Sequence, residues 1–147
     1  MRWVPQPNWH VTLRFVGEAD PAAVGEALSG AALPAATAAV GSRLETLART
    51  SLVVPVQGVD ELADAVLQAT SMIGRVEHDR QFRGHLTVGR SRGGRSIRRT
   101  ATGAAIGPTA SVEFDAGEVA LVASTLSPNG VTYSTVAAFT TVPGGAR

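Results

Sequence analysis

Two short segments of this chain share one pattern, and that pattern limits the possible fold more than any other feature. Residues 10–13 read His-Val-Thr-Leu, and residues 85–88 read His-Leu-Thr-Val. Polar and apolar side chains alternate in both, which is typical of a β-strand with one face in the core. The first alternation continues to residue 16 and predicts that Arg14 lies on the polar face with His10 and Thr12. Each strand then presents an imidazole and a hydroxyl side by side.

Helix and strand signals around these two segments predict an α+β fold. Asp20-Pro21 can begin a helix, with Asp as N-cap and Pro at the first position, that extends to Gly30 or Pro34. Asp60 is expected to cap a second helix over residues 61–73. Further strands are expected at residues 35–41, 51–57, 110–114, 118–124 and 131–139. We therefore predict helices over an antiparallel sheet, in one domain that spans residues 1–147.

Local sequence features give four finer expectations. Pro55 should mark the end of its strand or an edge strand, because proline cannot donate a backbone hydrogen bond to a sheet. The Ser-Pro-Asn-Gly run at 127–130 should form a hairpin turn. Gly93-Gly94 should open a loop that a short helix follows. Trp9 has the opposite parity to His10, so its indole should pack in the core.

The composition excludes several classes of function. The chain has 147 residues and no Cys, which rules out disulfide scaffolds, thiolate nucleophiles and cysteine metal sites. All 13 basic residues are Arg, so Walker A and Schiff-base chemistry, which need Lys, are also excluded. The N-terminus lacks the apolar region of a secretory signal, and no apolar run is long enough for a membrane span. We expect a cytoplasmic protein with no membrane partner.

Charge is distributed unevenly along the chain. Residues 1–79 carry five Arg against nine acidic residues, whereas residues 80–110 carry seven Arg and no acidic residue. The second segment is compatible with anion binding. From charge alone, a solvated Arg-rich loop explains it equally well.

The repeated His and Thr side chains suit one kind of chemistry. Two facing imidazoles can act as a general acid and a general base near neutral pH. Two threonine hydroxyls between them can donate to the oxygens of a tetrahedral anion, and a phosphodiester has the matching oxygens. This chemistry needs no metal and no cofactor, although a zinc site held by the two histidines is the competing interpretation. The third histidine, His78, lies in a polar stretch and is interpreted as a surface residue.

The motifs and their flanks resemble the 2H phosphoesterase superfamily, and within it the bacterial RNA 2′,3′-cyclic phosphodiesterase (2′-5′ RNA ligase) family. The resemblance rests on Arg2 to Glu18, on Arg80 to Arg90, and on the segment from Pro128 to Phe139. It implies two pseudo-symmetric α+β lobes that face each other across a cleft, each with one His-x-Thr pair. Family members often have Pro before the second histidine, where this chain has Gly84, a change expected to loosen the strand entrance.

The resemblance also implies an activity and residue roles. The activity is hydrolysis of a 2′,3′-cyclic phosphate at an RNA end, or of a cyclic nucleotide, to a 2′-phosphomonoester, with reversible 2′-5′ ligation as a further expectation. His10 and His85 would be the catalytic pair, with His10 protonating the leaving oxygen and His85 activating water. The expected phosphate-binding residues are Thr12, Thr87, Arg90 and Arg14. Strict alternation points Arg90 away from His85. The strand must therefore twist or end before Arg90 for this side chain to reach the phosphate.

Two further hypotheses follow from these comparisons. Family members have a strand and a helix before the segment that begins this chain, so we expect the first lobe to lack them. The exposed sheet edge would favour a homodimer. The alternative function is a non-catalytic RNA- or nucleotide-binding module that kept the cleft without turnover.

Overall fold

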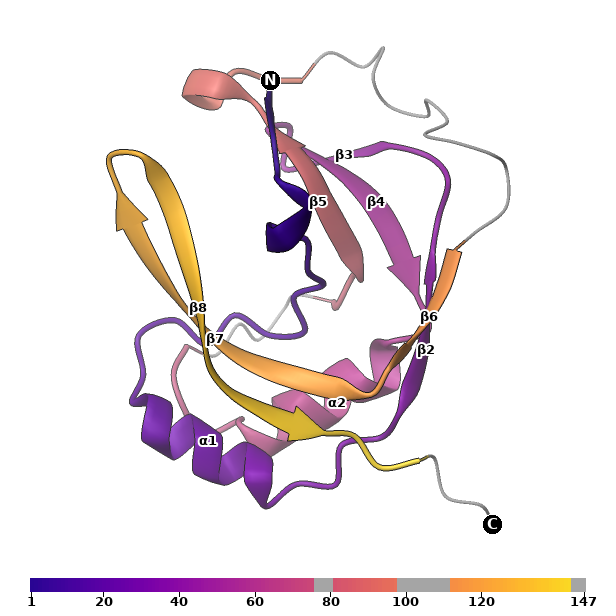
Figure 1. Cartoon of the computed structure of the whole chain (residues 1–147), viewed down its shortest axis with the longest axis vertical. Helices are drawn as coiled ribbons and strands as arrows, with labels where there is room; N and C mark the ends of the chain where they lie inside the picture. Colours follow the sequence, from indigo (N-terminus) through magenta and orange to yellow (C-terminus); the bar gives the residue numbers. More distant parts are fainter. Residues whose placement is uncertain (76–80, 98–111, 144–147) are drawn as a thin grey trace. The chain divides into compact units, whose positions relative to one another are not determined.

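The computed structural model describes residues 1–75, 81–97 and 112–143, and these fold into two compact units (Figure 1). Unit 1 comprises residues 1–12, 37–60 and 82–114, and unit 2 comprises residues 13–36, 61–81 and 115–147. The elements in chain order are β1 (Arg2–Trp3), η1 (Gln6–Asn8), α1 (Pro21–Ser29), β2 (Ala36–Val40), β3 (Glu45–Leu47), β4 (Ser51–Gln57), α2 (Asp60–Ala69), β5 (His85–Arg90), η2 (Arg92–Gly94), β6 (Val112–Ala116), β7 (Glu118–Ser127) and β8 (Gly130–Thr140). The predicted α+β class is confirmed.

Unit 1 is built around a sheet with the strand order β1-β5-β4-β2-β6, and β3 also pairs with β4. The valine-rich strand β4 lies inside this sheet and is buried along most of its length. Leu52 and Val54 project from one face of β4 and pack with Leu44 in the core of the unit. Pro55 lies near the end of β4, as one alternative predicted, but β4 is an interior strand and the edge alternative is wrong.

Unit 2 packs α1 and α2 with the β7–β8 hairpin, and their apolar stripes meet in one core. Its buried members are Val24, Leu28, Leu33, Leu62, Val66 and Val119. The start of α1 is as predicted, because the side chain of Asp20 accepts a hydrogen bond from the backbone N–H of Ala22 at 3.1 Å and Pro21 follows as the first helical residue. The predicted hairpin turn joins β7 and β8, where Ser127 pairs with Gly130 (Figure 1).

The second helix is shorter than predicted and ends at Ala69 instead of residue 73. Thr70, which follows it, turns its hydroxyl back to donate to the carbonyl of Val66 at 2.7 Å. The Arg14 guanidinium then donates to the carbonyls of Thr70, Ile73 and Arg75 at 2.5, 2.7 and 3.0 Å. A cation on these carbonyls also complements the negative end of the helix dipole, so Arg14 closes α2.

The predicted strand over residues 10–16 is wrong, apart from one bridging residue. Only Val11 pairs in a sheet, through an isolated antiparallel bridge to Leu86. The chain passes from unit 1 to unit 2 after Thr12, and the bonds of Arg14 to the end of α2 hold it there. Residues 95–97, which follow Gly94, are not helical, and the rest of the segment where a short helix was expected lies outside the described residues. Within the described part of the chain, no helix is long and apolar enough to span a membrane.

Replacing Arg14 by Ala should lower the free energy of unfolding by about 1–3 kcal/mol, because it leaves the acceptors at the end of α2 without their charged donor. Urea unfolding monitored by circular dichroism measures the change. Arg75→Ala is the matched control, since the side chain of Arg75 is exposed and only its backbone carbonyl takes part. Equal stability of both variants would contradict this role of Arg14.

Candidate active site

The two His-x-Thr motifs lie side by side because Val11 pairs with Leu86 in an antiparallel bridge. If this register continues by one residue on either side of the bridge, His10 is opposite Thr87 and Thr12 is opposite His85. Because side chains alternate between the faces of paired strands, these four side chains are then expected on the face opposite Val11 and Leu86. The histidines occupy one diagonal of this four-residue group and the threonines the other.

The expected separations suit a single phosphate. Side chains directly opposite each other in an antiparallel pair have Cβ atoms about 4.5–5.5 Å apart, and diagonal neighbours are about 7–8 Å apart. His10 and His85 are diagonal neighbours, so their Cβ atoms are expected to lie about 7–8 Å apart. The resemblance placed one motif in each lobe, whereas the structure places both in unit 1, because residues 1–12 run along β5. His10 is exposed and His85 is half-buried, so neither ring is enclosed in an apolar core.

Both imidazoles are held by the same local contact. Nδ1 of His10 lies 2.8 Å from the carbonyl oxygen of Asn8, and Nδ1 of His85 lies 2.8 Å from that of Arg83. A carbonyl oxygen only accepts, so each Nδ1 carries the hydrogen and donates it. The neutral form of each ring then has its lone pair on Nε2, the atom that can take up a proton.

Trp9 contributes to the position of the first histidine instead of to the core. Its side chain is 46% exposed, and the predicted core packing is wrong because Trp9 directly follows the 3-10 helix η1 and belongs to no strand. The indole Nε1 donates to the carbonyl of Val4 at 2.9 Å. The backbone N–H of Val4 in turn donates to the carbonyl of Val88 in β5, also at 2.9 Å. The residue next to His10 is therefore tied to the strand that carries His85.

A β-bulge in β5 turns Arg90 toward the motif face. Val53 pairs with Thr87, but the next residue of β4, Leu52, pairs with Gly89, so Val88 is an extra residue in β5. Ser51 then pairs with Arg90. Ser51 and Val53 share a face of β4, which puts Arg90 on the face of Thr87.

This bulge is the irregularity that the predicted role of Arg90 requires. The only sequence signal for it is the glycine inside the strand pattern, which often marks a bulge. Nη1 of Arg90 lies 3.2 Å from the hydroxyl oxygen of Ser51, to which it donates. Ser51 is 8% exposed, so the guanidinium of Arg90 is held by a buried hydroxyl. The sequence did not predict this contact.

Arg14 does not join this group, although its parity predicted that it would. Its guanidinium is engaged at the end of α2 in unit 2, where it also donates to the Thr70 hydroxyl at 2.6 Å. A second arginine, Arg83, forms an ion pair with Glu45 of β3. Glu45 is opposite Val53, in the same row of the sheet as Thr87.

Gly84, immediately before His85, is tightly packed, in contrast to the loose strand entrance that was expected. Its carbonyl accepts a hydrogen bond from Val56 at 2.9 Å, and a Cβ at this position would lie 2.3 Å from the carbonyl oxygen of Val56. No side chain fits at that distance without a backbone shift. The absence of a side chain at Gly84 therefore lets β5 start close against β4.

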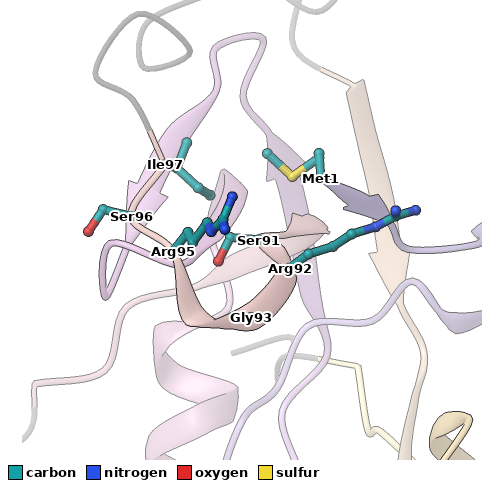
Figure 2. Close-up of a pocket in the computed structure, with 7 residues that line it drawn as sticks. All are labelled: Met1, Ser91, Arg92, Gly93, Arg95, Ser96 and Ile97. Atoms are coloured by element: carbon teal, nitrogen blue, oxygen red, sulfur yellow. The ribbon is translucent and has the colours of Figure 1, made fainter.

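A cavity of about 620 Å³ lies at the end of β5, and no residue of the two His-x-Thr motifs lines it. Figure 2 shows its lining. Its lining comes from Met1 and from the loop that follows Arg90, namely Ser91, Arg92, Gly93, Arg95, Ser96 and Ile97. In the described ranges, no group of three or more His, Cys, Asp or Glu side chains is placed to hold a metal ion. His78, Arg80, Arg98 and Arg99 lie outside those ranges.

Comparison with known proteins gives a sequence match and a fold match. Residues 1–44 match the family described as LigT-like phosphoesterase. No curated protein sequence matches the chain. Solved structures are similar over 95% of the chain at low sequence identity. E. coli LigT in complex with 3′-AMP is 21% identical, with a TM-score of 0.72 and 80% of its chain covered.

Two further structures agree with this result. TT0787 of Thermus thermophilus is 22% identical, with 95% of this chain and 81% of that chain covered and a TM-score of 0.74. E. coli LigT in complex with NADP⁺ is 20% identical, with 95% and 80% covered and a TM-score of 0.70. The chain therefore has the LigT fold over nearly its whole length and matches the LigT-like phosphoesterase family in its first 44 residues.

Proposed function

We propose that this protein hydrolyses RNA-terminal 2′,3′-cyclic phosphates to 2′-phosphomonoesters with His10 and His85 as the acid–base pair. The observation that carries this proposal is the Val11–Leu86 bridge in unit 1, because its register favours two histidines and two threonines on one face. The sequence match to LigT-like phosphoesterases over residues 1–44, which include His10 and Thr12, supports the reaction class. Solved LigT structures with 3′-AMP, ATP and NADP⁺ support a nucleotide as substrate.

The diagonal arrangement of the histidines fits an in-line displacement at phosphorus. In this reaction the attacking and leaving oxygens lie on opposite sides of the phosphorus atom. Nε2 of His85 takes a proton from water as the water oxygen bonds to phosphorus. The bond from phosphorus to O3′ breaks, and protonated His10 gives its Nε2 proton to O3′. Proton exchange with solvent then restores both rings. If the 5′-hydroxyl of a second RNA attacks in place of water, the same steps give a 2′-5′ link, and their reversal re-forms the cyclic phosphate.

The other three residues of the proposed site bind the phosphate. Thr12 and Thr87 lie on the second diagonal, where their hydroxyls can donate to the two non-bridging oxygens. Arg90 brings a positive charge to the same face, and Ser51 limits where its guanidinium can lie. Donors fixed in advance around a developing charge stabilise the transition state without reorganisation. Arg14 is left out of the site because the end of α2 occupies its guanidinium.

The His10→Ala and His85→Ala variants should each lower kcat/KM on adenosine 2′,3′-cyclic phosphate by about 10²–10⁴, because each loses one proton transfer. Chromatographic separation of substrate, 2′-AMP and 3′-AMP measures both the rate and the bond that breaks. His78→Ala, the variant of the remaining histidine, is the matched control and should keep wild-type turnover. Near-wild-type activity of His85→Ala would refute the assignment.

The pH dependence of kcat/KM should be bell-shaped. The reaction needs one neutral and one protonated imidazole, so activity falls at low pH, where the base is protonated, and at high pH, where the acid has lost its proton. Turnover should also survive an excess of chelator. A chelator-sensitive rate that added zinc restores would favour the competing zinc site held by the two histidines.

Replacing Arg90 by Gln should lower kcat/KM by about 10–100-fold, the usual size for a charge-assisted hydrogen bond to phosphate. The Arg43→Gln variant removes the same charge from unit 1, on the segment before β3, and is the control. If both variants lose activity equally, the total charge of the unit matters and the bulge that orients Arg90 does not. Nucleotide binding with no turnover in the wild-type protein would instead support the non-catalytic module.

A further inference from the structure

We propose that Arg2 binds a second phosphate of the substrate, so that the protein prefers a nucleotide chain with an internucleotide phosphate over a single cyclic nucleotide. This inference rests on the proposed function and adds a residue that selects the substrate. It starts from β1, the two-residue strand that lies beside β5 (Figure 1).

The register of β1 places Arg2 on the motif face. Arg2 pairs directly with Arg90, and Trp3 pairs with Gly89. Cross-strand partners share a face, and the bulge puts Arg90 on the face of His85 and Thr87. Arg2, Arg90 and Ser51 therefore form one row across β1, β5 and β4.

Packing on the face opposite the histidines fixes which side chains of β1 point to each face of the sheet. A Cβ at Gly89 would lie 3.3 Å from Cε3 of Trp3 and 3.0 Å from Sδ of Met1. The Trp3 and Met1 side chains therefore lie against the backbone of Gly89, which has no side chain to push them away. Since neighbouring side chains in a strand point to opposite faces, this contact directs Arg2 to the side of the histidines.

Arg2 and Arg90 bring two positive charges to the same row of the motif face. When the bulge is counted as one position, the row of Arg2 and Arg90 lies two positions along β5 from the row of Thr87. This corresponds to roughly 7 Å. That separation is comparable with the spacing of neighbouring phosphates in a nucleotide chain. Arg90 can then contact the reacting phosphate while Arg2 contacts the next one.

The charge of unit 1 supports a polyanionic substrate. Its described residues include seven arginines and three acidic residues, whereas those of unit 2 include two arginines and seven acidic residues. A chain of phosphates is therefore attracted to the unit that carries the motif face.

The test compares three substrates that all end in a 2′,3′-cyclic phosphate. They are adenosine 2′,3′-cyclic phosphate, the adenosine dinucleotide with a normal internucleotide phosphate, and the same dinucleotide with an uncharged methylphosphonate link. The wild-type protein should show a kcat/KM about tenfold or more higher on the charged dinucleotide than on the uncharged one, since the bases are identical and only the second charge differs.

Arg2→Gln should remove most of this difference, and Arg2→Lys should retain part of it. The slope of log kcat/KM against log salt should fall by about 0.7 for the charged dinucleotide in Arg2→Gln, as expected when one phosphate contact to a single strand is lost. Arg43→Gln, on the far side of β4 from β1, should keep the wild-type preference. Circular dichroism of each variant shows whether unit 1 remains folded.

The outcomes separate this inference from the proposed function. If the wild-type protein hydrolyses all three substrates but does not distinguish the charged link, or if Arg2→Gln lowers all three rates equally, the second phosphate contact is refuted and the proposed function stands. If none is hydrolysed, the proposed function fails. Calorimetric binding of 2′-AMP and of the dinucleotide 2′-phosphate to wild type and Arg2→Gln then decides the contact, and equal affinities for the dinucleotide would overturn it.

Discussion

The attachment of the N-terminal segment to β5 is the interaction on which the candidate site depends. Residues 1–12 meet β5 twice, through Arg2 and Trp3 at one end and through Val11 at the other. Trp9 and Val4 close the loop between these points by hydrogen bonds. Because both His-x-Thr motifs lie on these paired segments, the relative position of the two imidazoles is set within unit 1.

Irregular features of this small sheet do as much for the site as its regular pairing. The bulge at Val88 lets one strand present His85, Thr87 and Arg90 on a single face, which strict alternation forbids. Gly84 and Gly89 allow the backbone of Val56 and the side chain of Trp3 to come close on either side. A bulge is a common way to redirect a side chain. The carbonyl of Val88, the extra residue, accepts a hydrogen bond from the backbone N–H of Val4.

Arginine is the only strong cation of this chain, and the structure uses it for different purposes. Arg14 caps the end of α2 through main-chain carbonyls, a structural role in unit 2. Arg83 pairs with Glu45, and Arg90 rests on Ser51. Arginine suits all three because its planar guanidinium donates in several directions at once. In the described part of the Arg-rich segment, Arg83 therefore has a structural contact, and Arg90 is the arginine that we propose for the site.

The sequence by itself determined the two motifs, the α+β class, the start of α1 at Asp20 and the hairpin turn at 127–130, because each depends on local periodicity or on the conformational preference of a few residues. The tertiary structure decided what depends on partners far along the chain. It reduced the predicted strand over residues 10–16 to a single bridge at Val11, which pairs the two motifs. It also placed the Arg14 guanidinium at the end of α2 and left the Trp9 side chain exposed. Alternation assigns faces only while a strand stays regular, so a bulge or a change of unit, which has no local signature of comparable strength, reverses the assignment.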